Sequence, residues 1–186
     1  MSAPPAATPR RPAERDLLRA VAVVLEQRGY RTYVDPDGSD YFDLACRRGE
    51  EVGLVEGKVG APSAVLRQAL LRRSWADWVA VAVASRRTAE HLVARTAGRR
   101  SGFVGVWSVH GGTVLEHRPA SPTHGDGDSD AFATTRSLLR RTLQGIDRGE
   151  VPGDVRWSGV LGEVRRASGG RRWREWRLDE TADGPS

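Results

Sequence analysis

The chain has 186 residues, of which 39% are hydrophobic and 28% charged, with a formal net charge of +5 and a sequence pI of about 10.3. That length is enough for about one domain with a buried core, and a basic balance favours a polyanionic partner such as nucleic acid. A single cysteine excludes an internal disulfide, and no apolar run reaches the length of a membrane span. We therefore expect a cytoplasmic protein without a membrane anchor.

The N-terminal part predicts one helix and one strand. The first twelve residues are rich in Ala and Pro and predict a disordered tail. Residues 13–28 carry apolar side chains at three-to-four spacing, which predicts an amphipathic helix that ends at Gly29. Residues 31–34 predict a short strand, and the turn-forming sequence at 35–40 follows it.

A β-hairpin is predicted next. Two apolar runs, Tyr41–Cys46 and Val52–Val59, flank a short polar connection with Gly49 and Glu50 at its centre. A glycine in a short polar connection between two such runs is typical of a hairpin. The position of the turn determines which residues of the two strands face each other.

This register places three polar side chains on one face of the hairpin. Asp43 lies directly opposite Glu56, and opposed residues have Cβ atoms about 5 Å apart. Lys58 shares that face because side chains alternate along a strand. It is also the only lysine among 29 basic residues, and a compact ammonium can hold a water or a phosphate oxygen as a point charge. Because opposed carboxylates repel, the pair favours a cation between them.

The remaining elements alternate helices and strands. We predict a helix over 62–74, a buried strand over 78–84, a helix over 88–97 that stops at Gly98, a buried strand over 102–109 and its hairpin partner over 113–117. The order α-β-β-β-α-β-α-β-β predicts an α/β fold with a central mixed sheet flanked by helices. Trp75, Trp78 and Cys46 are interpreted as core residues.

Composition divides the chain into one domain with extensions. The predicted units are a tail (1–12), a domain (13–117), a linker (118–130), a C-terminal extension with a helix over 131–146 (131–180) and a final tail (181–186). The extension is rich in Arg and Trp at 165–177, which fits either an arm that contacts DNA or a solvated rim around core tryptophans.

The predicted site resembles that of a known enzyme superfamily. An acid at the start of a hairpin, Glu56-Gly57-Lys58 on the next strand and Gln68 on the following helix together resemble the PD-(D/E)XK nuclease superfamily. That superfamily includes type II restriction enzymes, archaeal Holliday-junction resolvases and RecB-type nuclease domains. The resemblance covers about residues 13–117 and implies a restriction-endonuclease-like core; residues 76–81 are similar to its next strand entry.

The resemblance implies a metal-dependent hydrolase. Asp43, Glu56 and the backbone carbonyl of Gly57 would hold Mg²⁺ or Mn²⁺, and Lys58 and Gln68 would complete the catalytic group. The implied reaction is endonucleolytic hydrolysis of DNA phosphodiester bonds in repair, recombination or defence. We expect no nucleotide cofactor, because no Walker or dinucleotide motif is present.

Basic residues supply the predicted contacts with DNA. Arg72 stands where RecB-type members carry a tyrosine, and we interpret it as a phosphate contact. The full predicted set is Arg72, Arg73, Arg171, Arg172 and Arg174. Cutting both strands of a duplex needs two sites, which makes a homodimer one expected state.

Several alternatives stay open. The literal Pro-Asp is Pro36-Asp37, which lies beyond the predicted hairpin, so Asp43 is preferred and Asp40 is second. The first-helix glutamate of resolvase-like members falls on Leu18, and Glu14, one turn earlier, could substitute for it. The same fold could also serve as a nucleic-acid-binding module without catalysis, or as a structural protein whose basic tail binds an acidic partner.

Overall fold

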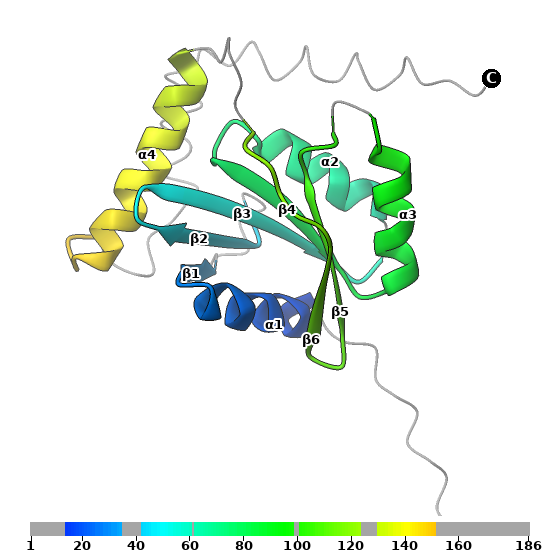
Figure 1. Cartoon of the computed structure of the whole chain (residues 1–186). Coiled ribbons are helices and arrows are strands. Elements are labelled where there is room, and N and C mark those ends of the chain that lie inside the picture. The colour runs from blue at the N-terminus through cyan, green and yellow to red at the C-terminus, as the bar shows by residue number, and fades with distance from the viewer. Residues whose placement is uncertain (1–13, 35–41, 61, 99–100, 124–129, 152–186) are drawn as a thin grey trace, which may run out of the picture.

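The computed structural model describes residues 14–34, 42–60, 62–98, 101–123 and 130–151 (Figure 1). The described residues form ten elements in chain order: α1 Glu14–Gln27, β1 Arg31–Val34, β2 Leu44–Arg48, β3 Glu51–Lys58, α2 Pro62–Arg72, β4 Trp78–Val83, α3 Arg86–Thr96, β5 Gly105–His110, β6 Thr113–Arg118 and α4 Asp130–Asp147. This order confirms the predicted succession of helices and strands. In this part of the chain, no helix is both long and apolar enough to cross a membrane.

The strands form one six-stranded mixed sheet in the order β1-β2-β3-β4-β5-β6. The central strands β3, β4 and β5 are parallel, and the pairs β1–β2, β2–β3 and β5–β6 are antiparallel. The predicted α/β class with a central mixed sheet is therefore confirmed. The carboxyl ends of β3, β4 and β5 meet at one edge, which is where open α/β sheets usually bind ligands.

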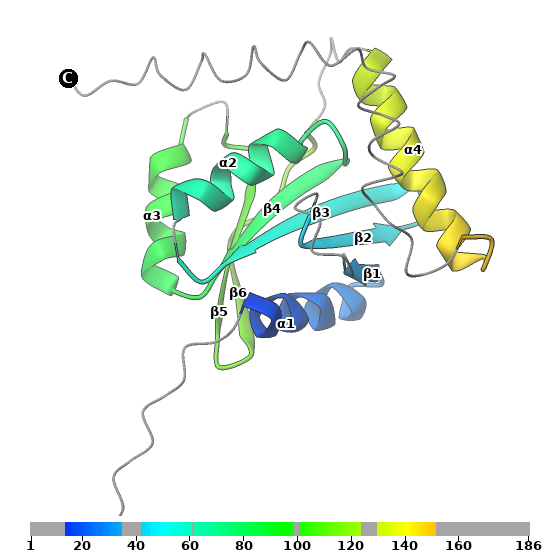
Figure 2. The ribbon, with the colours of Figure 1, turned by 180° about the vertical axis from the view of Figure 1, so that it is seen from behind.

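Helices cover both faces of the sheet. Figures 1 and 2 show α1 on one side and α2 with α3 on the other. The α1 side is filled by Leu17, Val21 and Leu25, which pack with alternate residues of the strands such as Val55. The cluster on the α2–α3 side includes Leu54 of β3 together with buried residues of both helices. Each face of the central strands is thus mainly apolar, as expected where helices cover a parallel sheet on both sides.

Helix α4 packs on the same side as α2. Leu139 and Leu143 are fully buried and belong to the cluster that contains Leu54. The helix is also joined to the sheet edge by Asp147, which accepts a hydrogen bond from the Tyr33 hydroxyl at 2.6 Å and from Arg47 Nε at 2.9 Å. The described part of the C-terminal extension therefore contributes to the core.

The β2–β3 hairpin has the predicted register. Leu44 pairs with Val55 and Arg48 pairs with Glu51, so the turn consists of Gly49 and Glu50 alone. Gly49 has φ of 60°, a conformation that favours glycine. The first strand runs over 44–48 rather than the predicted 41–46, because the ladder continues up to the tight turn.

Other bounds also differ from the predicted ones, and two of these differences have a clear cause. Helix α2 ends at Arg72 rather than at residue 74, because the chain turns there and the Trp75 amide donates to the Arg72 carbonyl at 2.8 Å. Strand β5 begins at Gly105 rather than at residue 102, because a turn precedes it in which the Val104 amide donates to the Ser101 carbonyl. Both corrections concern turns that interrupt an apolar run.

The predicted core residues are buried. Trp75 and Trp78 are 6% and 8% exposed, and Cys46 is fully buried, which raises the pKa of its thiol. The Trp78 ring lies directly over Gly53 of the neighbouring strand, where a Cβ would be only 2.1 Å from the ring. Gly53 therefore provides the space that this indole fills.

Candidate active site

Asp43 and Glu56 lie side by side on the α2–α3 face of the sheet. Asp43 immediately precedes β2, and Glu56 is in β3, next to the Leu44–Val55 pair. A side-chain hydrogen bond joins the two carboxyl groups. The Asp43 Oδ2 atom also accepts a hydrogen bond of 2.7 Å from the backbone amide of Gly57. The predicted juxtaposition of these two acids is present, and the Gly57 amide fixes the position of one of them.

Burial disfavours the ionisation of both carboxyl groups of this pair. Glu56 is 2% exposed, and its burial, followed by the nearby charge of Asp43, raises its pKa to about 8. Burial also raises the pKa of Asp43, against the opposing effect of the hydrogen bond from Gly57. Both carboxyl groups therefore favour their protonated forms more than exposed acids do.

Lys58 completes this group and pairs with the first helix. It follows Glu56 by two residues and so shares its face, and the charges of Asp43 and Glu56 both act on it. Its Nζ atom donates to Glu14 Oε1 at 2.6 Å. Burial by itself lowers the pKa of Lys58, but the Glu14 hydrogen bond and the neighbouring acids outweigh it and the pKa is raised. Lys58 therefore remains an ammonium.

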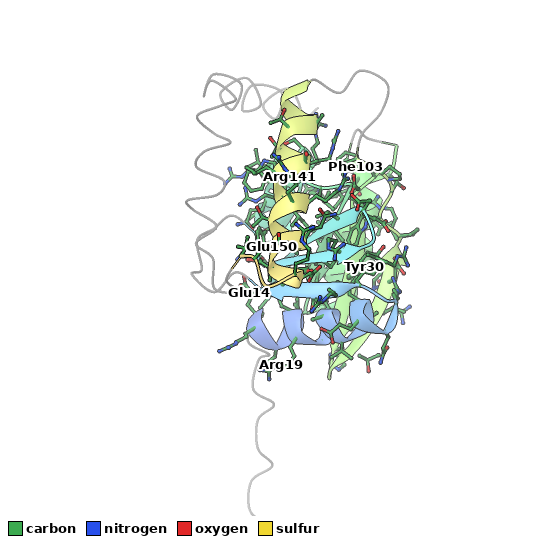
Figure 3. The ribbon with its side chains drawn as sticks, turned by 90° about the vertical axis from the view of Figure 1, so that its left-hand side faces the viewer. Glu14, Arg19, Tyr30, Phe103, Arg141 and Glu150 are labelled. Carbon is green, nitrogen blue, oxygen red and sulfur yellow. The ribbon has the colours of Figure 1, made fainter. Side chains whose placement is uncertain are left out.

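Glu14, rather than Leu18, is the first-helix residue that enters the site. Glu14 lies at the start of α1, at the opposite end of the helix from Tyr30 (Figure 3). The Leu18 side chain instead packs on Gly57, where a Cβ would be 2.8 Å from Leu18 Cδ2. The sequence did contain a signal for this residue: Glu14 is an acid in the first turn of the helix, one turn before Leu18.

Helix α2 carries a glutamine and an arginine one turn apart, and the arginine reaches Glu56. The Oε1 atom of Gln68 is buried and has no hydrogen-bond partner among the described residues. Arg72, one turn later, is 9% exposed, and its Nε atom lies 3.5 Å from Glu56 Oε1. Its guanidinium also stacks 4.7 Å from the centre of the Trp75 ring. Arg73 is half-buried just beyond the helix.

Some predicted residues lie outside the described residues. These are the alternative acids Asp37 and Asp40 and the C-terminal arginines Arg171, Arg172 and Arg174.

The oxygen ligands that this site offers suit a hard cation. The oxygens of Asp43 and Glu56 are the type of ligand that Mg²⁺ prefers, and Glu56 Oε1 is buried without a hydrogen-bond donor among the described residues. The amide of Gly57 points to the Asp43 side of β3, and the amide and carbonyl of a strand residue face the same edge, so its carbonyl faces that side too. Across the described ranges there is no group of three or more His, Cys, Asp or Glu residues arranged to hold a metal. The protein would therefore supply two carboxylates and one carbonyl.

Comparisons with known proteins found no match for this chain. No protein-family model matches the chain, and it matches neither a curated protein nor a solved structure. The function proposed below is therefore inferred from the chemistry of the protein's own residues.

Proposed function

We propose that this protein is a metal-dependent nuclease that hydrolyses phosphodiester bonds in DNA. The observation that carries the proposal is the hydrogen-bonded pair of Asp43 and Glu56, with Lys58 beside it on the same face of the sheet. The order of elements from α1 to β4 agrees with the restriction-endonuclease-like core that the superfamily resemblance implies. The formal charge of +5 favours a polyanionic substrate. A cytoplasmic location is proposed together with this function.

Asp43, Glu56 and the Gly57 carbonyl would hold Mg²⁺ or Mn²⁺. Like charges that are buried together are stabilised by a cation, and Glu56 Oε1 has a free lone pair for one in the described structure. When bound, the ion would lower the pKa of a water molecule and neutralise charge on the scissile phosphate. One or two carboxylates suffice for Mg²⁺, which otherwise keeps water and substrate oxygens as ligands.

Lys58 is proposed to orient the attacking water and to balance the negative charge that develops on the phosphate. Glu14 would hold the Lys58 ammonium in place through its 2.6 Å contact. Gln68, whose Oε1 is buried without a partner among the described residues, would accept a hydrogen bond from that water. Hydrolysis adds water across one P–O bond and yields a phosphate monoester and a free hydroxyl group.

Cleavage of plasmid and branched DNA tests this proposal. We expect cleavage by the purified protein in Mg²⁺ or Mn²⁺ and none in EDTA. Lys58→Ala should lower the rate at least about a hundredfold. Asp43→Asn should do the same, although its amide oxygen can still accept the Gly57 hydrogen bond. Arg86→Ala is the matched control, because it removes one positive charge from an exposed ion pair on α3. Cleavage that persists at the normal rate in both site variants would refute the proposal.

A second candidate is a DNA-binding module of the same fold without catalysis. The observation in its favour is that the basic groups of the site are already paired, Lys58 with Glu14 and Arg72 with Glu56. This candidate predicts DNA binding that weakens steeply with salt and no cleavage in any divalent ion. In either case Arg73 and the C-terminal arginines Arg171, Arg172 and Arg174 are proposed to contact phosphates, and a homodimer would supply two such surfaces.

A further inference from the structure

Arg72 lies deeper than a residue that merely contacts DNA from the surface. Its side chain is 11% exposed, and the Glu56 side chain that it faces is 2% exposed. The central carbon of its guanidinium lies over the Trp75 ring, 4.7 Å from the ring centroid, and Trp75 is itself 6% exposed. The indole therefore holds the guanidinium in place from one side, while Glu56 faces it from another.

The contact between Arg72 and Glu56 is electrostatic rather than a closed hydrogen bond. The distance from Arg72 Nε to Glu56 Oε1 is 3.5 Å, beyond the usual range of about 2.7–3.2 Å for such a bond. Glu56 Oε1 has no hydrogen-bond donor among the described residues. The arginine thus supplies charge to Glu56 while leaving this oxygen able to bind another cation.

Three charges act most strongly on Glu56 in the described structure. They are the negative charge of Asp43 and the positive charges of Arg72 and Lys58. Lys58 is engaged by Glu14 at 2.6 Å, outside the carboxyl pair. Lys58 acts on both acids as well, but Arg72 is the cation that forms an ion pair with Glu56.

We propose that Arg72 is a resident counter-ion of the Asp43–Glu56 pair, which balances the charge of the pair in the absence of a divalent ion and opposes the binding of that ion. The effect of Arg72 on the binding of a divalent ion rests on the proposed metal-dependent function. A divalent ion on Glu56 would lie close to the guanidinium, and two like charges repel strongly in a buried environment. Arg72 thereby makes ion binding weaker than the two carboxylates alone would allow.

Calorimetric titration of Mn²⁺ into the full chain, without DNA, tests the proposal. Arg72→Met keeps an unbranched stem to pack on Trp75 and removes the charge, so Mn²⁺ should bind about tenfold more tightly than to the unaltered chain. Arg72→Lys keeps the charge and should stay within about threefold of the unaltered chain. Arg67→Met is the matched control, since Arg67 is an exposed arginine on the same helix, and it too should change the affinity by less than about threefold.

The outcomes separate this proposal from the proposed function. Unchanged or weaker Mn²⁺ binding by Arg72→Met would overturn the counter-ion role. Binding by Arg72→Met but not by the unaltered chain would support that role and refute the metal-dependent function of the natural protein. Absence of binding by both would overturn the two together.

A second variant covers the case in which Arg72→Met does not fold. Adding Glu56→Gln removes the carboxyl group that Arg72 faces, so no buried acid is left without its partner and the double variant Arg72→Met/Glu56→Gln should fold. Thermal unfolding without divalent ions measures this. A double variant that also fails to fold would show that Arg72 supports the fold in another way, and would overturn the proposal.

Discussion

The Lys58 ammonium at the end of β3 lies 2.6 Å from Glu14 Oε1, 44 residues earlier at the start of α1. The two side chains are 29% and 39% exposed, so this ion pair contributes only about 0–1 kcal/mol to stability. The ion pair therefore acts mainly on position: it fixes the direction of the flexible Lys58 side chain beside Asp43 and Glu56.

Glu14→Ala is expected to slow DNA cleavage by about ten- to hundredfold, because Lys58 would no longer be held in one geometry. The free energy of unfolding should change by less than about 1 kcal/mol. Cleavage rates and urea unfolding measure the two quantities. Glu90→Ala is the control, since it breaks an exposed 2.8 Å pair with Arg86 on α3. Equal cleavage rates for the two variants would contradict the role of Glu14.

The hairpin register could be predicted from the sequence because it depends on local features. A glycine-containing connection and alternating apolar residues are sufficient to set the turn at Gly49 and Glu50, and this turn aligns Asp43 with Glu56. The same reasoning places Lys58 on their face. These relationships need no knowledge of the rest of the fold.

The orientation of the helices was harder to predict from the sequence, because tertiary packing determines which of their side chains face the site. Which residue of α1 reaches the site depends on how the helix is rotated on the sheet, and contact between Leu18 and Gly57 determines that rotation. Similarly, an arginine at the end of α2 could face water or the sheet, and stacking on Trp75 turns Arg72 inward. Neither contact is visible in the spacing of residues along the chain.

Without divalent ions, the protein should lose stability as the pH rises from about 5 to about 8. The pKa of Glu56 is about 8 in the folded protein, above its ordinary value of 4.5. Between those values the folded state binds more protons than the unfolded state, so the free energy of unfolding decreases with increasing pH. Urea unfolding across this range measures the slope.

Glu56→Gln should flatten that pH dependence, because the amide has nearly the shape of the protonated acid and does not titrate. The exposed Glu90→Gln substitution on α3 should leave the slope unchanged. A slope in Glu56→Gln equal to that of the unaltered chain would assign the pH dependence to other groups.

At pH 8, Mn²⁺ should stabilise the protein. An ion that binds only the folded state, at a hundred times its dissociation constant, adds about 2.7 kcal/mol, which corresponds to about 5–10 °C in the melting temperature of a chain of this size. Asp43→Asn should reduce this shift, because one ligand charge is lost. Thermal unfolding with and without Mn²⁺ provides the measurement, and an equal shift in Asp43→Asn would locate the ion elsewhere.

Gly53→Ala should destabilise the fold by about 1–3 kcal/mol, because the added methyl group must displace a buried indole. Its Cβ would be 2.1 Å from Trp78 Cζ2, and Trp78 also packs edge-on against Tyr30 at 5.8 Å. The ring therefore has little room to move. Gly60→Ala is the matched control, since no atom lies within 4 Å of its added Cβ. Urea unfolding of both variants measures the difference, and equal midpoints would show that the sheet accommodates a side chain beneath Trp78.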